Sequence, residues 1–312
     1  MRRFFAIGLV VAAAALVVAA TSPFGSAVSP GAPHWRLTVL RPLPGFSASY
    51  RTEPAGIDDD GTVVGQSSTH SLCDRAVAWR HGRVIDLGGL GGCESAATAI
   101  DGGRIAGWAD TGAGVRHAVV WERGRIRDLG TGGRAEGEAT AFTSRGIQGI
   151  SYDLDAEGVA IRTIDVLWEG GRVERLPAPR PSPQLRLRGN PDVCVGRGTG
   201  AAGVIGMCVD ATGSTRAYLW RGGRATPIGG VGTDVHDLNG RGQVVGERES
   251  YGVKRPFVWE DGRVVWLPMF ERPRGDVFRE YDALFVNARG DVAGLGTLPD
   301  GSTLPVLWRY VR

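Results

Sequence analysis

The sequence predicts an all-β protein, a six-bladed β-propeller of four-stranded blades. Six times, a glycine that ends one short apolar strand is followed by a tryptophan that ends the next strand. The tryptophans lie 42, 47, 52, 39 and 49 residues apart, a period typical of blades, solenoid coils or arrays. The six pairs are Gly65 and Trp79, Gly107 and Trp121, Gly149 and Trp168, Gly206 and Trp220, Gly246 and Trp259, and Gly294 and Trp308.

Each repeat is expected to contain four strands and no helix. In the second repeat the strands are Ala96 to Ile100, Arg104 to Ala109, His117 to Trp121 and Arg125 to Leu129. The third strand is apolar on both faces, so it must be covered on both sides. A glycine three residues after the tryptophan marks a two-residue hairpin, and an Asx residue marks the first turn. Four-stranded sheets stacked face to face in radial repetition form a propeller.

The two ends of the chain complement each other. The last repeat stops at Trp308 to Arg312 without a fourth strand, whereas Trp35 to Leu43 has the pattern of one. The N-terminal strand is therefore expected to complete the last blade and close the ring. A right-handed β-solenoid is the main alternative fold, although the coils of a solenoid need no complementary ends.

The N-terminus has the pattern of a secretory signal. Arg2 and Arg3 precede an apolar stretch from Phe4 to Ala20, and small residues follow. We expect a signal peptide over residues 1–27, a short linker over 28–34 and the propeller over 35–312, in a protein secreted to the extracellular space. An uncleaved membrane anchor is the alternative, because 17 apolar residues is near the lower limit of about 17 to 25 for a span.

The charge of the mature chain excludes some partners. Residues 1–27 contain two of the 36 basic residues, which leaves 34 against 33 acidic ones. A nearly neutral protein is not expected to bind nucleic acid or anionic lipid as its main partner. No other segment is long enough to span a membrane, and we expect a monomer.

The cysteines predict two disulfides. Cys73, Cys93, Cys194 and Cys208 make an even number in an exported chain, which favours disulfides over metal binding or catalysis. Four cysteines allow three pairings. In the propeller geometry, Cys73 lies in a loop after a second strand and Cys93 in a loop after a fourth strand, at the same face. Cys194 and Cys208 flank one hairpin and should pair across it.

The repeated motif resembles that of the bacterial extracellular HAF-repeat family. Ile57 to Gly65 and Asp86 to Gly92 match its Ile-Asn/Asp-x-x-Gly-x-Val-Val-Gly and Asp-Leu-Gly-x-Leu-Gly-Gly elements. His117-Ala118-Val119 is the nearest approach to the His-Ala-Phe tripeptide, and the resemblance runs from about residue 35 to 310. It implies a secreted repeat protein and no particular activity.

The third and fourth repeats depart from the pattern. Ile150 to Arg162 is expected to be an enlarged loop, and the connection from Leu176 to Cys194 is long and rich in proline and arginine. Gly198 to Gly203 has the spacing of a dinucleotide fingerprint, but a strand follows it where a helix is required. We therefore expect a long hairpin turn there.

No reaction centre is evident in the sequence. The five histidines lack zinc-binding spacings, and there is no Gly-x-Ser-x-Gly elbow, so no metal, cofactor or catalytic residue is predicted. The loops after the second and fourth strands carry aromatic and acidic residues suited to stacking on sugar rings and bonding hydroxyls, unless they are ordinary loop composition. These low-specificity ligand candidates are Trp108, Asp110, Tyr152, Asp153, Asp155, Tyr251 and Tyr281.

The functional hypothesis is a secreted binding or interaction module that recognises a glycan or a cell-envelope component. One alternative is a secreted carbohydrate-active hydrolase or lyase that uses Asp110, Asp153 or Asp155, provided two carboxylates stand about 5 to 9.5 Å apart. A second alternative is a structural repeat protein of the cell surface.

Overall fold

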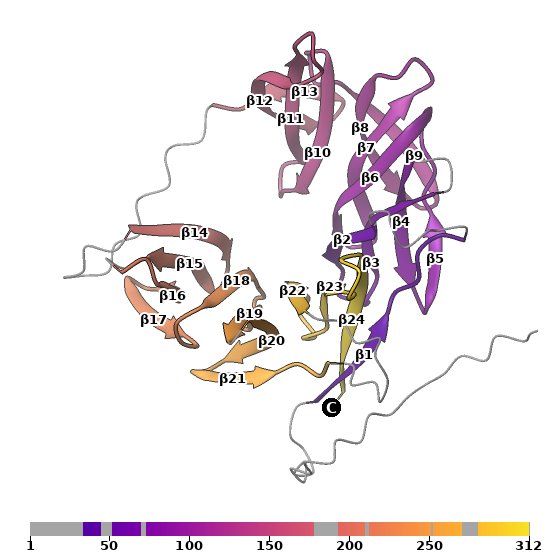
Figure 1. The fold of residues 1–312 in the computed structure, drawn as a ribbon. Helices are drawn as coiled ribbons and strands as arrows, with labels where there is room; N and C mark the ends of the chain where they lie inside the picture. Colours follow the sequence, from indigo (N-terminus) through magenta and orange to yellow (C-terminus); the bar gives the residue numbers. More distant parts are fainter. Residues whose placement is uncertain are drawn as a thin grey trace, which may run out of the picture. The chain divides into compact units, whose positions relative to one another are not determined.

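The computed structural model describes residues 34–44, 52–69, 73–177, 193–209, 212–250, 252–269 and 280–311, which belong to a compact unit of residues 33–312. These residues form strands and turns, and none of them lies in a helix, so none belongs to a helix that could cross a membrane. The strands make six four-stranded antiparallel sheets, as predicted (Figure 1). The expected signal peptide (1–27) lies outside the described residues, as does most of the linker.

Each sheet is one blade, and five blades follow the chain in order. The first is β2 (Thr52–Ile57), β3 (Val63–Ser68), β4 (Asp74–Arg80) and β5 (Arg83–Asp86); the second is β6 (Gly91–Asp101), β7 (Arg104–Thr111), β8 (Arg116–Glu122) and β9 (Arg125–Gly130). The third is β10 (Glu136–Phe142), β11 (Ile147–Leu154), β12 (Ala160–Glu169) and β13 (Arg172–Arg175); the fourth is β14 (Val193–Gly200), β15 (Gly203–Val209), β16 (Thr215–Arg221) and β17 (Arg224–Ile228). The fifth is β18 (Thr233–Leu238), β19 (Val244–Ser250), β20 (Val253–Glu260) and β21 (Arg263–Trp266).

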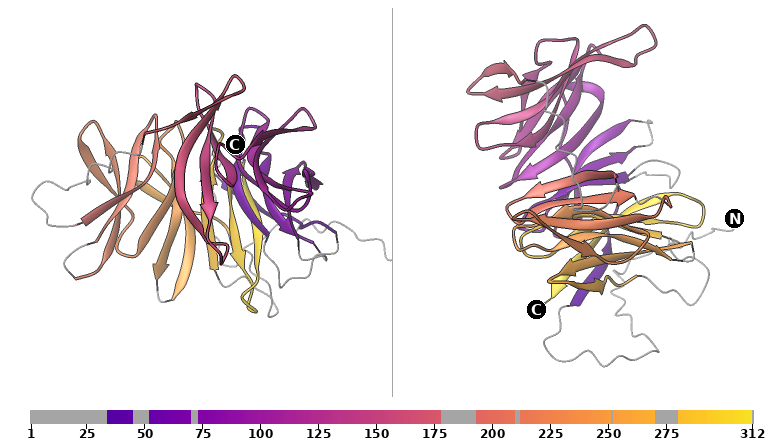
Figure 2. Two further views of the ribbon diagram at one scale, coloured as in Figure 1. Left: turned by 90° about the horizontal axis from the view of Figure 1, so that it is seen from above. Right: turned by 90° about the vertical axis from the view of Figure 1, so that its left-hand side faces the viewer.

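The sixth blade takes its fourth strand from the N-terminus, as the chain ends predict. It contains β22 (Glu280–Val286), β23 (Val292–Thr297), β24 (Thr303–Val311) and β1 (His34–Val39). β1 runs antiparallel to β24 with Trp35 opposite Tyr310, and the two strands lie side by side in Figure 2. The indole of Trp35 also donates a 2.8 Å hydrogen bond to the carbonyl of Gly290.

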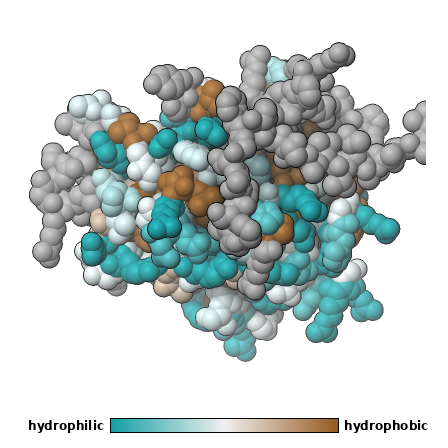
Figure 3. All heavy atoms as spheres, turned by 90° about the horizontal axis from the view of Figure 1, so that it is seen from below, coloured by the Kyte–Doolittle hydropathy of each residue, from teal (hydrophilic) through white to brown (hydrophobic). Residues whose placement is uncertain are grey.

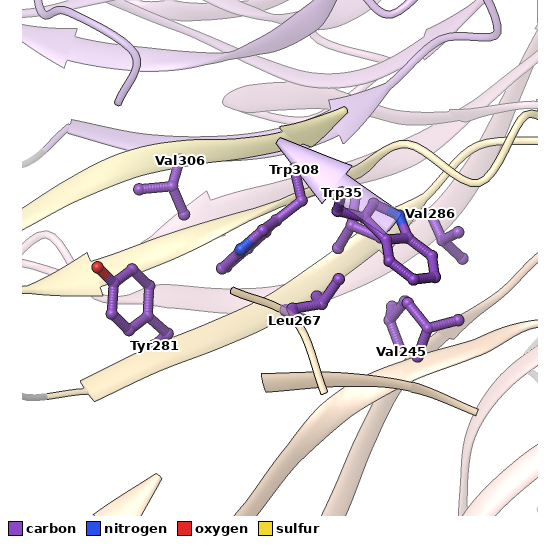
Figure 4. Packing of buried hydrophobic residues seen from close by; sticks show 10 residues of the cluster. Trp35, Val245, Leu267, Tyr281, Val286, Val306 and Trp308 are labelled. Carbon is purple, nitrogen blue, oxygen red and sulfur yellow. The ribbon is translucent and has the colours of Figure 1, made fainter. Parts of the chain in front are cut away.

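Five hydrophobic clusters stabilise the fold, and each joins two consecutive blades. The repeated tryptophan of a blade packs against the preceding blade; Trp121, for example, contacts a cluster with Val64 and Ala78 of the first blade. Figure 4 shows the cluster of the fifth and sixth blades, where Leu267 lies beside Trp308 and Val245 lies below the ring of Trp35. The clusters of described residues cover the boundaries 1–2, 2–3, 4–5, 5–6 and 6–1.

The repeated glycine of the second strand is required by a close backbone approach. A Cβ atom on Gly107 would lie 2.0 Å from the carbonyl oxygen of Ala96 on the neighbouring first strand. The same distance is 2.0 Å at Gly246 and 1.9 Å at Gly294. Because any side chain would collide with backbone there, only glycine fits, and this explains its near-constant distance from the tryptophan.

A β-bulge interrupts the first strand of every blade. The register against the second strand shifts by one residue at the same place in all six pairs. A bulge turns one extra side chain out of the regular alternation and is a common device for aiming a functional group. The extra residues are Ala55, Thr98, Thr140, Arg197, His236 and Leu284.

The turns contain the residue types that the sequence predicts, but two of them are shorter than expected. Both central residues of the third hairpin have positive φ, as at His81 (49°) and Gly82 (75°). The expected enlarged loop after Ile150 is instead an extension of β11 and β12, closed by a short turn in which Asp155 accepts backbone hydrogen bonds. The expected long turn at Gly198 to Gly203 is also short, because β14 continues to Gly200.

Both predicted disulfides form. Cys194 and Cys208 lie directly opposite each other on β14 and β15, so the bond crosses one hairpin. Cys73 lies just before β4, and its partner Cys93 is part of β6 rather than of a loop, because β6 begins at Gly91. The Cys73–Cys93 bond therefore ties the first blade to the second.

Candidate functional site

The first strand of each blade is an edge strand of its sheet. From the fourth blade round through the sixth and first to the third, the first strands of consecutive blades contact one another and form an inner edge. Three positions of each blade recur at this edge: a first-strand residue, the bulge residue two positions later, and the second-strand residue that follows the repeated glycine. The side chains at these positions vary around the six blades, although the register of the first two strands is the same in each. In chain order the first-strand residues are Glu53, Ala96, Glu138, Val195, Asp234 and Asp282, and the second-strand residues are Gln66, Trp108, Ile150, Met207, Glu247 and Leu295.

A hollow of about 430 Å³ opens at the inner edge of the sixth, first and second blades. Its polar groups include the carboxylate of Glu53 and the amide of Gln66, and its aromatic groups are Trp108 and Phe285. The remaining lining comes from Pro54, Ala55, Ala96, Ala97 and Thr98. Of the sequence-predicted ligand residues, Trp108 is the one on this wall.

An arginine holds Trp108 in place and joins it to the acidic residues nearby. The guanidinium carbon of Arg116 lies 3.5 Å from the centre of the Trp108 ring, a cation–π contact. Arg116 also lies 2.9 Å from a carboxylate oxygen of Glu138 on the third blade and 3.7 Å from one of Asp110. Trp108 and Asp110, both predicted, therefore meet around a cation that the sequence analysis did not identify.

Tyr152 belongs to the same network, but it is not the exposed aromatic that was expected. Its side chain is buried, and its hydroxyl donates a 2.9 Å hydrogen bond to Glu138. Burial raises the pKa of this phenol strongly, and the negative charge of Glu138 raises it further. Tyr152 therefore stays protonated and positions Glu138 rather than stacking on a ligand.

Asp110 lies within β7, opposite Arg116, rather than in the loop where it was expected. Burial raises the pKa of its carboxyl group above the ordinary value, against the opposing effect of the Arg116 guanidinium. Asp153 lies apart in an ion pair with Arg134, at 2.7 Å. Asp155 caps its own turn by accepting from the backbone N–H groups of Glu157 and Val159. Asp153 and Asp155 thus serve local structure.

Tyr281, another predicted ligand residue, does not line the hollow. Tyr281 is 1% exposed and packs on Trp308 in the core between the fifth and sixth blades, with ring centres 5.8 Å apart (Figure 4). The expectation that it is an exposed contact residue is wrong, because alternation along β22 turns Tyr281 inward. Tyr251 lies outside the described residues.

A second polar cluster, which the sequence analysis missed, lies at the boundary of the fifth and sixth blades. The imidazole Nε2 of His236 lies 2.8 Å from an oxygen of the buried Glu247, and Asp234 is close to both. Burial alone would lower the pKa of His236, but the hydrogen bond and charge of Glu247 raise it overall. The pKa of Glu247 is also raised, chiefly by burial.

The sequence contains a signal for Glu247 but none for His236. Glu247 follows the repeated Gly246, at the position that holds Trp108 in the second blade. Aligning the repeats on their glycine and asking which neighbouring positions vary would have selected Glu247 together with Trp108. The bulge that positions His236 has no such signature, because no single side-chain type is common to all six bulge residues.

The surface away from the first hollow has fewer features of a binding site. On the face drawn in Figure 3, hydrophilic side chains predominate, with scattered hydrophobic ones between them. A second hollow, of about 670 Å³, lies at the opposite ends of the strands, between the first turns of the second and third blades. There the guanidinium carbon of Arg104 lies 4.5 Å from the centre of the Phe142 ring.

No protein-family model and no curated protein matches the sequence. Among solved structures, a gluconolactonase from Xanthomonas campestris is similar at 13% identity over 89% of this chain and 90% of that one, with a TM-score of 0.42. The Aleuria aurantia lectin is similar at 8% identity over 82% and 93%, with a TM-score of 0.36. The β-propeller domain of a trilobed protease from Pyrococcus furiosus is similar at 13% identity over 84% of this chain and 94% of that one, with a TM-score of 0.32. The six sheets themselves establish that this chain is a six-bladed β-propeller.

Proposed function

We propose that this protein is an exported propeller module that binds a glycan in the hollow of the sixth, first and second blades. The observation that carries the proposal is the indole of Trp108 on the wall of that hollow, beside the carboxylate of Glu53 and the amide of Gln66. A sugar ring has an apolar face that stacks on an indole and hydroxyls that bond to carboxylate and amide groups. The volume of about 430 Å³ falls within the range of small-molecule sites, about 300 to 1,000 Å³.

The ordering of Trp108 supports a binding role. Its contact with Arg116, which is itself tied to Glu138 and Asp110, fixes the ring before any ligand arrives. A fixed ring loses little conformational entropy on binding, so more of the contact energy appears as affinity.

Two features support export. The N-terminal pattern is that of a secretory signal, and both cysteine pairs are oxidised, which is typical of proteins in oxidising compartments. Membership of the HAF-repeat family is part of the same proposal, on the strength of the repeated motif.

The test is a glycan array with the purified protein, followed by calorimetric titration of each ligand found. Trp108→Ala should weaken binding at least tenfold, or about 1.4 kcal/mol. Trp266→Ala is the matched control, because Trp266 is also half-buried with arginines near its ring, at 5.0 and 5.1 Å, but lies on the outer strand of the fifth blade. Binding that survives Trp108→Ala, or no ligand on the array, would count against the proposal. Analysis of each bound glycan for cleavage products separates binding from hydrolysis.

A further inference from the structure

The cluster at the boundary of the fifth and sixth blades has the composition of a metal site. Asp234, His236 and Glu247 each offer one ligand atom, and these atoms all lie within 4.8 Å of one another. Tetrahedral zinc bonds of about 2.0 to 2.2 Å place neighbouring ligand atoms roughly 3.3 Å apart. The His236–Glu247 separation of 2.8 Å is close to that value, so small side-chain rotations would admit an ion.

The backbone explains why these three groups meet. Asp234 lies opposite Glu247 in the β18–β19 pair, so their side chains share one face of the sheet. His236 is the extra residue of the β-bulge between Val235 and Asp237, which brings the imidazole to the same place. All three groups are thus held by paired strands, and Glu247 is shielded, with its side chain 7% exposed.

A carboxylate oxygen beside the cluster lacks a hydrogen-bond donor. This residue is Asp282, on β22 of the sixth blade. Its Oδ1 is buried, and no described residue donates a hydrogen bond to it. The ammonium of Lys254 lies 3.6 Å away, beyond hydrogen-bonding distance. Asp282 is carried by β22, which contacts β18 and β19, the two strands of the cluster. Lys254 is thus an ion-pair partner of Asp282, but a cation bound closer to Oδ1 would compensate more fully for the burial of this oxygen.

The cations already present do not fill this role. Arg197 approaches Asp234 at 3.7 Å, and about half of its side chain is exposed. Lys254 is also partly exposed. Both contacts are longer than a hydrogen bond, so they are screened ion pairs of small energy that a bound ion can replace.

We propose that Asp234, His236 and Glu247 bind one divalent transition-metal ion, with Asp282 as a fourth ligand or as the acceptor of a metal-bound water. One imidazole and two or three carboxylates suit Zn²⁺ or Mn²⁺, whereas Mg²⁺ and Ca²⁺ favour oxygen ligands alone. On binding, the proton shared between His236 and Glu247 leaves to solvent, and the imidazole nitrogen and carboxylate oxygen each form a bond to the metal. The site lies apart from the hollow that holds Trp108, so it does not depend on the proposed glycan binding.

The experiment is a calorimetric titration of the full chain, first stripped with a chelator, with ZnCl₂, MnCl₂ or CaCl₂ alone. We expect one Zn²⁺ per chain and weaker Mn²⁺ binding, following the Irving–Williams order. Glu247→Gln keeps the shape and the hydrogen bond to His236 but removes the charge, and it should raise the Kd for Zn²⁺ at least tenfold. Asp234→Asn and Asp282→Asn should weaken binding in the same direction.

The control is a second histidine–carboxylate pair without further ligands. His117 Nδ1 lies 2.9 Å from Asp128 on the outer side of the second blade, so His117→Gln should leave the Kd for Zn²⁺ unchanged. Circular dichroism of each metal-free variant checks its fold, and if Glu247→Gln does not fold, the partly exposed Asp234→Asn decides. Absence of saturable Zn²⁺ and Mn²⁺ binding would overturn the proposal, as would Zn²⁺ binding that neither Glu247→Gln nor Asp234→Asn weakens.

Discussion

The indole nitrogen of Trp79 donates a 2.7 Å hydrogen bond to the carbonyl oxygen of Arg41, which follows the N-terminal strand of the sixth blade. Trp308 makes the same bond, also of 2.7 Å, to the carbonyl of Pro268 at the end of the fifth blade. In both places a leucine precedes the accepting residue, and its N–H binds the third strand of its own blade. The tryptophans of the first and sixth blades thus bind the end of the blade before them, whereas the buried indole nitrogens of Trp121 and Trp168 find no acceptor among the described residues.

This latch predicts how the third blade meets the fourth. Leu176 donates to Asp165 as Leu40 and Leu267 do to their own third strands, so Pro177 stands where Arg41 and Pro268 stand. The indole nitrogen of Trp220 is buried, and no described residue accepts its hydrogen bond. We expect the Trp220 indole to donate to the carbonyl of Pro177, which would bring these two blades together and complete the ring.

Hydrogen exchange of the indole N–H groups, followed by NMR, measures this. The Trp220 signal should be protected to a degree similar to that of Trp79, and Trp220→Phe should cost stability comparable to Trp79→Phe, about 1 to 3 kcal/mol. Rapid exchange at Trp220 beside slow exchange at Trp79 would show that the third and fourth blades do not close on each other.

The repeated glycines should not tolerate even a methyl group. In Gly107→Ala the new Cβ would lie 2.0 Å from the carbonyl oxygen of Ala96, so the two strands must separate. We expect a loss of about 1 to 3 kcal/mol in the free energy of unfolding, measured by urea denaturation. Gly112→Ala is the control: its φ is not positive and the nearest atom is 3.9 Å away, so it should change stability by less than about 0.5 kcal/mol. Similar values for both variants would contradict this explanation.

The two disulfides should stabilise the protein by similar amounts. If the disulfides act by restricting the unfolded chain, removal of either pair costs about 2 to 4 kcal/mol. Their sequence separations are 20 and 14 residues, so the loop-entropy contributions of the two bonds differ by only about 0.3 kcal/mol. The measurement is guanidinium unfolding of Cys73→Ala/Cys93→Ala and Cys194→Ala/Cys208→Ala. A much larger loss for the first pair would mean that it holds the first two blades together in the folded state.

The carboxyl of Asp110 should give stability a defined pH dependence. Because its pKa is above the ordinary 3.8 in the folded protein, the folded state binds this proton more tightly than the unfolded state. The contribution of the group to stability is therefore full below pH 3.8 and falls as the pH rises through the folded pKa. Urea unfolding from about pH 3 to about pH 7 should show a difference between wild type and Asp110→Asn that declines over this window and is flat above it. A difference that grows with pH has the wrong sign for burial.

Much of the fold follows from local chemistry, and so the sequence alone determined it. The positive φ at Gly82, the strand that completes the last blade and the pairing of Cys194 with Cys208 depend on residues close in the repeat pattern or on the count of strands. The prediction failed where strand length depended on the partner strand, as in β11 and β12, since alternation alone does not say where pairing stops.

The candidate sites were decided by the tertiary structure. The sequence proposed both Trp108 and Tyr281 as exposed ligand residues; in the structure Trp108 lines a hollow, whereas alternation along β22 turns Tyr281 into the core. His236 meets Glu247 because a bulge shifts the register by one residue. Arg116 of the second blade meets Glu138 of the third only because the two blades pack together. Repetition of packing residues fixes the architecture, but the contacts between blades bring together side chains that are distant in the chain, and those contacts form only in the folded protein.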